Sequence, residues 1–312
     1  MYILIPGDVC YNVYTGLFPV VKESGKDYAM LKYILFLLSE YYYTVMESRL
    51  CEIHEKVSSH QIKVVLKKAI PAALDESGVN PAEALIITDE PGAARRMLEA
   101  GCYVVILYHE KNRGMDFPSA RYGVEDVFML EYQSYEEAYK RLAGLPWDIL
   151  ETDRLRVRES TVEDVDEFYR IYKEPSITLY IENLYTEREA ELAYMRAYID
   201  QIYGFYGYGL WTVILKKTGQ VIGKAGLSVR EGYEMPELGF VIDAGYQHQG
   251  YGYEVCRAIL RYAKSELDFD EVQALVKKEN QISMRLLDKL GFVFMRDVTE
   301  RDSDYRLYVR HG

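Results

Sequence analysis

A glycine-rich segment near residue 250 has the residue types and spacing of an anion-binding loop. Gly250 and Gly252 stand between an alternating, β-rich stretch at 238–242 and a stretch with helical apolar spacing at 255–267. The first N–H groups of a helix lack partners inside the helix and lie at the positive end of its dipole. Because glycine has no Cβ atom, the backbone at 249–253 can approach an anion closely. The segment therefore predicts a site for a phosphate or pyrophosphate group.

The spacing of these glycines differs from two common nucleotide-binding motifs. It matches neither the G-x-x-x-x-G-K-[ST] pattern of P-loops nor the G-x-G-x-x-G pattern of dinucleotide-binding folds. A pair of glycines where a strand meets a helix also occurs for packing reasons alone. The glycines by themselves leave both interpretations open.

The wider segment resembles the GNAT family of acetyl-coenzyme A-dependent N-acetyltransferases. The family motif Q/R-x-x-G-x-G/A after a strand corresponds to Gln247, Gly250 and Gly252. The other matching features, in chain order, are an opening strand at 152–158 like that of the ribosomal-protein alanine acetyltransferases, a strand at 271–277, Asn280, Ser283 and Gly291-Phe292. The resemblance covers residues 150–312, about half of the chain, and implies that acetyl-coenzyme A is the co-substrate.

The resemblance also assigns residues that bind this co-substrate. In the family, two strands splay apart, which leaves main-chain N–H groups unpaired. The resemblance implies that such N–H groups at 240–242 stabilise the oxyanion that forms during acetyl transfer. Asn280 would hydrogen-bond the pantetheine arm, with helix capping as the alternative, and His248 would contribute only its backbone. The full expected set is Phe240, Val241, Ile242, Gln247, His248, Gln249, Gly250, Tyr251, Gly252, Tyr253, Asn280 and Ser283.

Acetyl transfer to an amine needs a neutral amine and a leaving thiolate that is finally protonated. Glu237 begins the strand that faces the thioester in the family, so it is the expected general base. An ordinary surface or ion-paired glutamate is the alternative, and Glu234 is a nearby competitor. Many family members have, at the position of Leu287, a tyrosine that acts as the general acid and protonates the thiolate. Ser283 matches a serine of the ribosomal-protein branch and is the expected substitute, although water could also protonate the thiolate.

The expected reaction is direct attack by a primary amine in a ternary complex, with no metal. The amine could belong to a protein N-terminus, an amino acid, a polyamine or another small molecule. In similar enzymes a segment corresponding to 177–183 and a helix at 187–203 form one wall of the substrate pocket. A non-catalytic sensor or regulatory protein that binds acyl-coenzyme A is the alternative, because the tyrosine acid is absent.

The first half of the chain alternates between predicted strands and helices. Strands are expected at 2–5, 43–46, 84–88 and 103–107, and helices at 28–38, 64–77 and 92–100. Such alternation implies a parallel sheet covered by helices on both faces. We therefore expect a Rossmann-like, three-layer α/β domain.

Residues 69–102 resemble the Rossmann-like C-terminal half of haloacid dehalogenase-like (HAD) proteins, in which an acid at the position of Asp89 helps to hold Mg²⁺. That family needs two aspartates two residues apart. In this chain the residues two positions before and after Asp8 are Pro6 and Cys10, so the pair is incomplete. A degenerate HAD-like domain that packs, binds or regulates is therefore expected. The alternative is a retained phosphatase-like phosphate or metal site formed by Asp8, Ser48 and Asp89.

A predicted helix at 133–142 is broken at 144–147, which favours a domain boundary near residue 148. The expected domains are 1–147 and 148–312. The second half contains a strand at 155–158, a helix ending near 172, a hairpin at 210–227 and the motif segments above. The predicted fold is thus α/β plus α+β: a Rossmann-like α/β domain followed by a GNAT-fold mixed sheet flanked by helices.

Composition and charge narrow the function classes. A net charge of −12 argues against a nucleic-acid surface and suits a cationic amine. The four cysteines form no C-x-x-C pair, which argues against a disulfide framework or a zinc site. The N-terminus lacks a signal-peptide pattern, and the longest apolar run is far below the ~20 residues that span a bilayer. We expect a cytoplasmic protein with no nucleic-acid or membrane partner, and the oligomeric state stays open.

Overall fold

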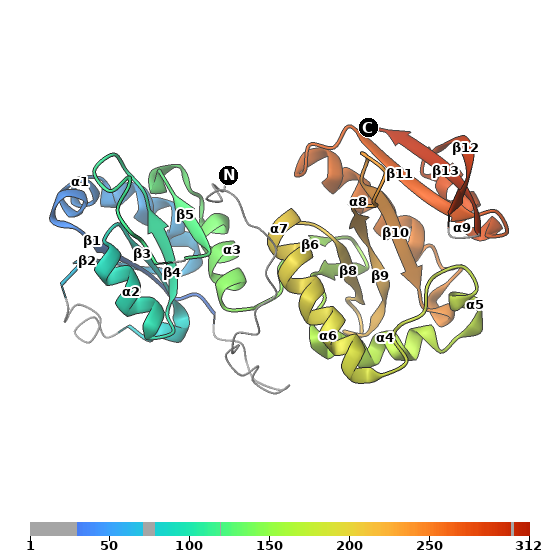
Figure 1. The fold of residues 1–312 in the computed structure, drawn as a ribbon, viewed down its shortest axis with the longest axis horizontal. Helices are drawn as coiled ribbons and strands as arrows, with labels where there is room; N and C mark the ends of the chain where they lie inside the picture. Colours follow the sequence, from blue (N-terminus) through green and yellow to red (C-terminus); the bar gives the residue numbers. More distant parts are fainter. Residues whose placement is uncertain (1–29, 71–78, 119, 301–302) are drawn as a thin grey trace. The chain divides into compact units, whose positions relative to one another are not determined.

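The computed structural model describes residues 30–70, 79–118, 120–300 and 303–312. The chain divides into two compact units, Met1–Leu145 and Pro146–Gly312 (Figure 1). The predicted strand at 2–5 and Asp8 lie outside the described residues. Each unit has its own hydrophobic core.

In the described part of the first unit, five strands form a parallel sheet in the order β2-β1-β3-β4-β5. The strands are β1 (Tyr33–Leu38), β2 (Lys63–Lys68), β3 (Ala84–Thr88), β4 (Tyr103–Leu107) and β5 (Tyr122–Val124), and the helices are α1 (Glu40–Val57), α2 (Pro91–Glu99) and α3 (Tyr132–Leu142). Alternate side chains of β1 pack against α1 and α3 or against α2. The predicted parallel sheet with helices on both faces is confirmed.

Three predictions in this unit are wrong. The expected helix at 28–38 is strand β1 over Tyr33–Leu38. A central parallel strand is apolar on both faces, so its sequence lacks the alternation that separates a strand from a buried helix. The expected strand at 43–46 lies within α1, whose first turn is capped by the Ser39 side chain accepting the N–H of Tyr42. The expected helix at 64–77 is strand β2 over Lys63–Lys68, and residues 71–78 lie outside the described residues.

In the described residues of the second unit, eight strands form one mixed sheet in the order β12-β13-β11-β10-β9-β8-β7-β6. The strands are β6 (Asp148–Glu151), β7 (Leu155–Arg158), β8 (Leu210–Leu215), β9 (Val221–Ser228), β10 (Glu237–Ile242), β11 (Glu271–Lys277), β12 (Val293–Glu300) and β13 (Ser303–His311). The helices are α4 (Val165–Tyr172), α5 (Pro175–Thr178), α6 (Arg188–Tyr198), a π-helix (Ile199–Tyr203), α7 (Gly204–Tyr206), α8 (Tyr251–Ser265) and α9 (Gln281–Lys289). The predicted antiparallel run of β8, β9 and β10 is confirmed, whereas β6 was not predicted.

Helices cover both faces of this sheet. Side chains of α8 and α9, such as Ile259 and Leu287, share a core with Leu238 and Ile242 of β10. On the opposite face, α4 and α6 pack together over Val241 (Figure 1). Alternate residues of β10 therefore face two different layers of the unit.

The central strands β10 and β11 separate along most of their length. They pair in parallel only at Glu237 and Gln273, although β10 pairs with β9 over all of Glu237–Ile242. The edge of β10 beyond Glu237 is thus not covered by β11. This opening in the middle of the sheet positions the candidate site.

Candidate active site

A cavity of about 1540 Å³ lies where β10 and β11 separate. Glu237, Phe240 and Val241 line it from β10, and Asn280 and Ser283 line it from the start of α9. These five sequence-predicted residues therefore border one cavity. The remaining candidates are not among its lining residues; they are Ile242 and the loop residues Gln247, His248, Gln249, Gly250, Tyr251, Gly252 and Tyr253.

The loop between β10 and α8 holds its shape through its own side chains. The Gln247 Nε2 group donates to the Ile242 carbonyl at 2.9 Å, and the Gln249 Nε2 group donates to the Gly245 carbonyl at 3.0 Å. Gly250 precedes α8 with a φ of +85°, in the left-handed region that favours glycine. The first N–H groups of α8 have no helical acceptor, so this end of the helix can receive an anion.

Arg154, the residue before β7, holds the same loop through contacts with Gln249 and Glu254. It was not predicted as a site residue. Its Nη2 lies 2.6 Å from a carboxylate oxygen of Glu254, and its Nη1 donates to the Gln249 carbonyl at 3.1 Å. Burial opposes ionisation of Glu254, but hydrogen bonds from Thr152 and Arg154 lower its pKa below the usual value. The sequence feature that could have indicated this pairing is Glu254, an acidic residue in the first turn of α8, where negative charge is favourable.

Glu237 is held in an ion pair in the cavity wall. Arg230 donates through Nε to one Glu237 oxygen and through Nη2 to the other at 3.2 Å. Its Nη1 also donates to Glu300 of β12 at 2.8 Å, and Tyr233 donates to Glu300 at 2.7 Å. The pKa of Arg230 is raised, first by its hydrogen bond to Glu237. Glu237 is therefore ion-paired in this structure, as in the alternative interpretation. Glu234, the nearby competitor, is exposed and is not among the residues that line the cavity.

Asn280 and Ser283 begin helix α9. The Asn280 Oδ1 atom accepts the N–H of Ser283 at 3.1 Å, so the capping role that was its alternative is observed. Both residues nevertheless line the cavity. Leu287, which stands where many relatives carry a tyrosine acid, is fully buried in the core. Of these three side chains, only those of Asn280 and Ser283 border the opening.

Tyrosines gather on the α6 side of the cavity. The lining tyrosines there are Tyr172, Tyr180, Tyr185, Tyr194, Tyr198, Tyr206 and Tyr208. The rings of Tyr185 and Tyr194 have centroids 5.8 Å apart, and those of Tyr194 and Tyr198 are 5.9 Å apart. Carboxylates lie among them, including Glu182 and Glu191. This part of the cavity can contact both apolar and cationic groups of a ligand.

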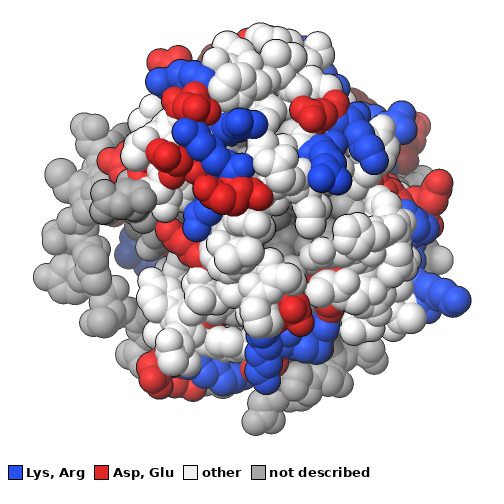
Figure 2. Space-filling model, turned by 90° about the vertical axis from the view of Figure 1, so that its right-hand side faces the viewer, with Lys and Arg blue, Asp and Glu red and all other residues white. Residues whose placement is uncertain are grey.

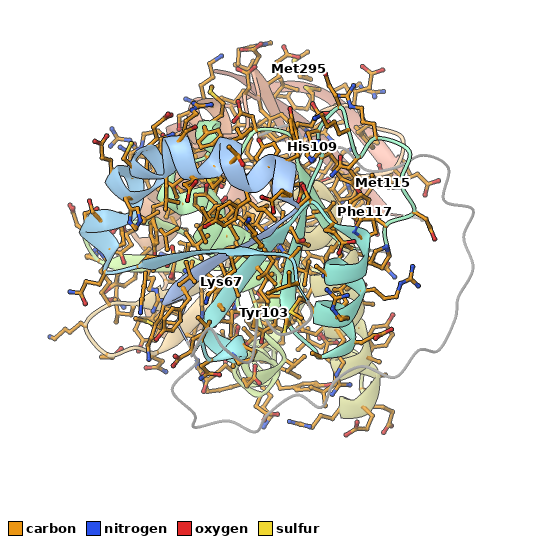
Figure 3. The ribbon with its side chains drawn as sticks, turned by 90° about the vertical axis from the view of Figure 1, so that its left-hand side faces the viewer. Lys67, Tyr103, His109, Met115, Phe117 and Met295 are labelled. Carbon is orange, nitrogen blue, oxygen red and sulfur yellow. The ribbon has the colours of Figure 1, made fainter. Side chains whose placement is uncertain are left out.

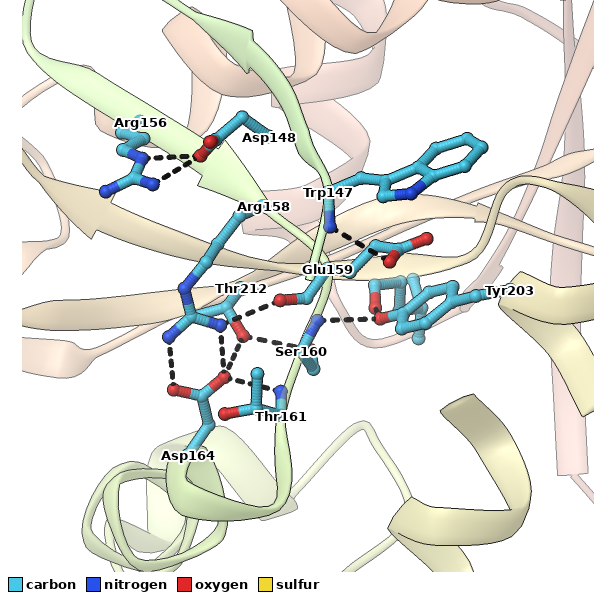
Figure 4. A network of polar contacts seen from close by, with 11 residues as sticks. Trp147, Asp148, Arg156, Arg158, Glu159, Ser160, Thr161, Asp164, Tyr203 and Thr212 are labelled. Carbon is cyan, nitrogen blue, oxygen red and sulfur yellow. Dashed lines mark hydrogen bonds and ion pairs between the residues drawn. The ribbon is translucent and has the colours of Figure 1, made fainter. Parts of the chain in front are cut away.

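A buried polar network anchors this wall to the sheet (Figure 4). Arg158 of β7 donates to both oxygens of Asp164 at 2.7 Å, and Thr212 of β8 donates to Asp164 at 2.8 Å. Nearby, the Ser160 N–H donates to the hydroxyl of Tyr203 at 3.1 Å. The network therefore joins two strands, the start of α4 and the π-helix that follows α6.

In the first unit, Asp89 lies at the end of β3 and is almost fully buried. Its oxygens accept the N–H and hydroxyl of Ser39 at 2.7 and 2.5 Å, and one also lies 2.9 Å from Nε2 of His109 (labelled in Figure 3). Ser48 is exposed and donates to the carbonyl of Val45. The Asp89 carboxylate thus joins the ends of β1 and β3 to the segment after β4.

Metal-binding clusters and membrane-spanning helices are both absent from the described residues. The described ranges contain no group of three or more His, Cys, Asp or Glu side chains placed to hold a metal ion. No helix in the described part of the chain combines the length and apolarity needed to cross a membrane. On the face shown in Figure 2, described Lys and Arg side chains lie among Asp and Glu side chains.

Comparison with known proteins agrees with the geometry of the second unit. Residues 154–293 match the family model of the acetyltransferase (GNAT) domain. The chain is similar to YkkB of Bacillus subtilis (strain 168), with 27% identity over 169 residues, 52% of this chain and 94% of YkkB. It is also similar to the N-acetyltransferase YnaD of the same strain, with 29% identity over 141 residues, 45% of this chain and 79% of YnaD.

Among solved structures, the ribosomal-protein-S5-alanine acetyltransferase of Vibrio fischeri matches with a TM-score of 0.46 and 15% identity, covering 52% of this chain and 95% of that one. The family match shows that residues 154–293 form a GNAT acetyltransferase domain. The chain therefore contains the domain of an acyltransferase, a GNAT N-acetyltransferase domain. A domain of this family implies acetyl transfer from acetyl-coenzyme A.

Proposed function

We propose that the protein transfers the acetyl group of acetyl-coenzyme A to a primary amine bound on the tyrosine-lined side of the cavity. The observation that carries this proposal is the opening between β10 and β11, which brings Glu237, Val241 and Ser283 to one cavity. An amine entering from the α6 side could reach a thioester held against the uncovered edge of β10. Both substrates would then be bound together, which favours direct attack in a ternary complex.

The loop before α8 is the proposed site of the pyrophosphate. A Cβ atom on Gly252 would lie 3.5 Å from Leu286 Cδ2 and 3.8 Å from Ile242 Cγ1, which are ordinary van der Waals contacts. Packing therefore does not require glycine at this position, and close approach of a ligand is the better explanation. Residues 247–253 would bind the pyrophosphate, and residues 240–242, Asn280 and Ser283 would bind the pantetheine and thioester end.

Glu237 is the proposed general base. The amine nitrogen attacks the thioester carbonyl carbon, the C–S bond breaks, and the amine gives up a proton to Glu237 directly or through a water molecule. Backbone N–H groups in 240–242 stabilise the oxyanion, and Ser283 or water protonates the departing thiolate. Arg230 holds the Glu237 side chain in one orientation in the cavity wall.

For the first unit we propose a degenerate HAD-like, Rossmann-like domain with a packing, binding or regulatory role. The parallel sheet with helices on both faces supports this assignment. The occupied hydrogen-bonding positions of Asp89 favour a structural role over a retained metal site. We further propose domains of 1–147 and 148–312 and a cytoplasmic location.

A second candidate function is binding of acyl-coenzyme A without turnover. The observations that favour it are the ion pair on Glu237 and the buried Leu287 at the position of the tyrosine acid. Such a sensor would bind acetyl-coenzyme A tightly and release no thiol with any amine. The two candidates therefore differ in one measurable quantity.

The test is thiol release from acetyl-coenzyme A in the presence of a panel of amines, for the unaltered protein and for Glu237→Gln, Ser283→Ala and Glu234→Gln. Loss of a general base is expected to lower kcat about 10²-fold or more in Glu237→Gln while co-substrate binding persists. Glu234→Gln is the matched control, because it removes an exposed carboxylate three residues away. Equal rates in Glu237→Gln and the control would contradict the role of Glu237.

A further inference from the structure

Glu191 of α6 is a buried carboxylate with an unused oxygen in the wall of the cavity. The residue is 1% exposed and borders the cavity. Its Oε2 atom accepts the N–H of Tyr185 at 3.0 Å, whereas its Oε1 atom has no hydrogen-bond partner among the described residues. A buried carboxylate oxygen without a donor is costly. In a cavity wall, the missing donor can come from a bound ligand or from water.

The surroundings of Glu191 favour a positively charged donor. Tyr185 and Tyr194 border the same part of the cavity, and their rings lie 5.8 Å apart. Glu191 also contributes to raising the pKa of Tyr194, after burial as the main cause. Aromatic faces attract ammonium and guanidinium groups, and a carboxylate in a site of low dielectric binds a cation more strongly than in water.

Lys224 is the basic side chain that could neutralise Glu191 from within the protein. It borders the cavity from β9, but its Nζ lies 4.6 Å from the centroid of the Phe168 ring. The charge of Glu191 acts to raise the pKa of Lys224, so the two groups attract each other, but Oε1 of Glu191 accepts no hydrogen bond from any described residue. Arg230, another basic residue of the lining, is already paired with Glu237 and Glu300. Lys224 thus offsets part of the Glu191 charge, while the Oε1 atom still lacks a hydrogen-bond donor that a bound cation can supply.

We propose that Glu191 and the adjacent tyrosines bind a second cationic group of the acceptor, so that the preferred substrates are diamines or longer polyamines. This inference rests on the proposed acetyl transfer and adds a substrate class to it. One amine of the acceptor reaches the thioester near Val241, and a distal ammonium group donates to Glu191 Oε1. Specificity would then come from a residue that takes no part in the transfer step.

The test compares α,ω-diamines of increasing length with monoamines and amino alcohols of matched length, in the full chain. We expect the best diamine to exceed its matched monoamine in kcat/KM by about tenfold, as one charge-assisted hydrogen bond implies. Glu191→Gln should abolish this preference, so that kcat/KM for the diamine falls about tenfold further than kcat/KM for the monoamine in the same variant. Glu189→Gln is the matched control, because Glu189 is an exposed acid on the same helix.

Two further comparisons test the cation site. Tyr194→Leu alters a ring that is 44% exposed, so the fold should tolerate it, and we expect a loss of about threefold in the diamine preference. An amino alcohol that matches the diamine would overturn the assignment of a cation. So would a diamine preference that survives in Glu191→Gln.

Calorimetric titration of the diamine into protein saturated with coenzyme A separates this inference from the proposed function. Diamine binding that weakens about tenfold in Glu191→Gln, with no turnover of any amine, would support the cation site and contradict acetyl transfer. Turnover of monoamines and diamines at equal rates, with equal binding in both proteins, would support acetyl transfer and overturn the cation site.

Discussion

At the scale of single residues, Gly250 and Gly252 make different demands on the backbone. Gly250 has a φ of +85°, which is costly for any residue with a Cβ atom. Gly252 lies in the first turn of α8 and has room for a Cβ atom. One glycine is thus explained by conformation, and the other by the ligand that we propose to lie against it.

This difference can be measured with two alanine substitutions. Gly250→Ala should lower the free energy of unfolding by about 1 kcal/mol, because alanine is strained in the left-handed region. Gly252→Ala should keep or raise stability by up to about 1 kcal/mol, because alanine is the better helix former. It should nevertheless weaken acetyl-coenzyme A binding. Denaturant unfolding and calorimetric titration check both points, and unchanged affinity in Gly252→Ala would contradict a pyrophosphate at this position.

Lys224 gives a prediction about pH. Burial lowers the pKa of Lys224 below its usual value of 10.5, so the unfolded chain holds this proton more tightly than the folded protein. The cost to stability is therefore largest at pH values below the folded pKa and shrinks as the pH rises towards 10.5.

Lys224→Met removes the buried ammonium group and should raise the free energy of unfolding by about 1 kcal/mol at neutral pH. The gain should decrease as the solution becomes more alkaline. Urea unfolding of the unaltered protein and of Lys224→Met, at neutral and at alkaline pH, measures this difference in the free energy of unfolding. A difference that stays constant with pH would show that the substitution acts through packing instead.

At the scale of elements, β9 holds β10 in the position that the site needs. A Cβ atom on Gly223 would lie 2.1 Å from the carbonyl oxygen of Val241, so the two strands approach closely at this point. Gly223→Ala should displace β10, lower the free energy of unfolding by about 2 kcal/mol and reduce thiol release. Thermal unfolding and initial rates test this together. Full activity with unchanged stability would mean that the backbone of β10 need not be held here.

The order of elements in the second unit could be predicted because its local signals agree. The hairpin of β8 and β9 has a Lys217-Thr218-Gly219-Gln220 turn, and α8 follows a glycine loop. In the first unit, aromatic and β-branched residues near 43–46 suggested a strand, although Ser39 starts a helix there. Local composition cannot decide such cases, because burial against the sheet determines the outcome.

Only the site residues that stand in or beside a sequence motif could be predicted. Glu237, Asn280 and Ser283 stand in or beside the family motifs and do line the cavity. Arg230 and Glu191 were missed, because their roles depend on pairing or on cavity walls formed by segments distant in the chain. A charged residue in a sequence gives no sign of whether its partner is a neighbour, a ligand or solvent.

At the scale of the whole molecule, the cavity belongs entirely to the second unit. Its described lining residues run from Tyr172 to Tyr305, and the unit begins at Pro146. A chain of residues 146–312 should therefore fold by itself and release thiol with kcat/KM within about threefold of the full chain. Circular dichroism and initial rates measure this. A folded but inactive fragment would show that the first unit contributes to catalysis.

Acetylation of an amine with acetyl-coenzyme A can be tested by mass spectrometry of an amine panel incubated with the protein and acetyl-coenzyme A. Thiol release is followed in the same samples. We predict an acetylated amine in equal amount to the released thiol, formed fastest with a diamine and slowly with Glu237→Gln. Saturable acetyl-coenzyme A binding without any acetylated amine would contradict the proposed acetyl transfer and identify the protein as an acyl-coenzyme A sensor.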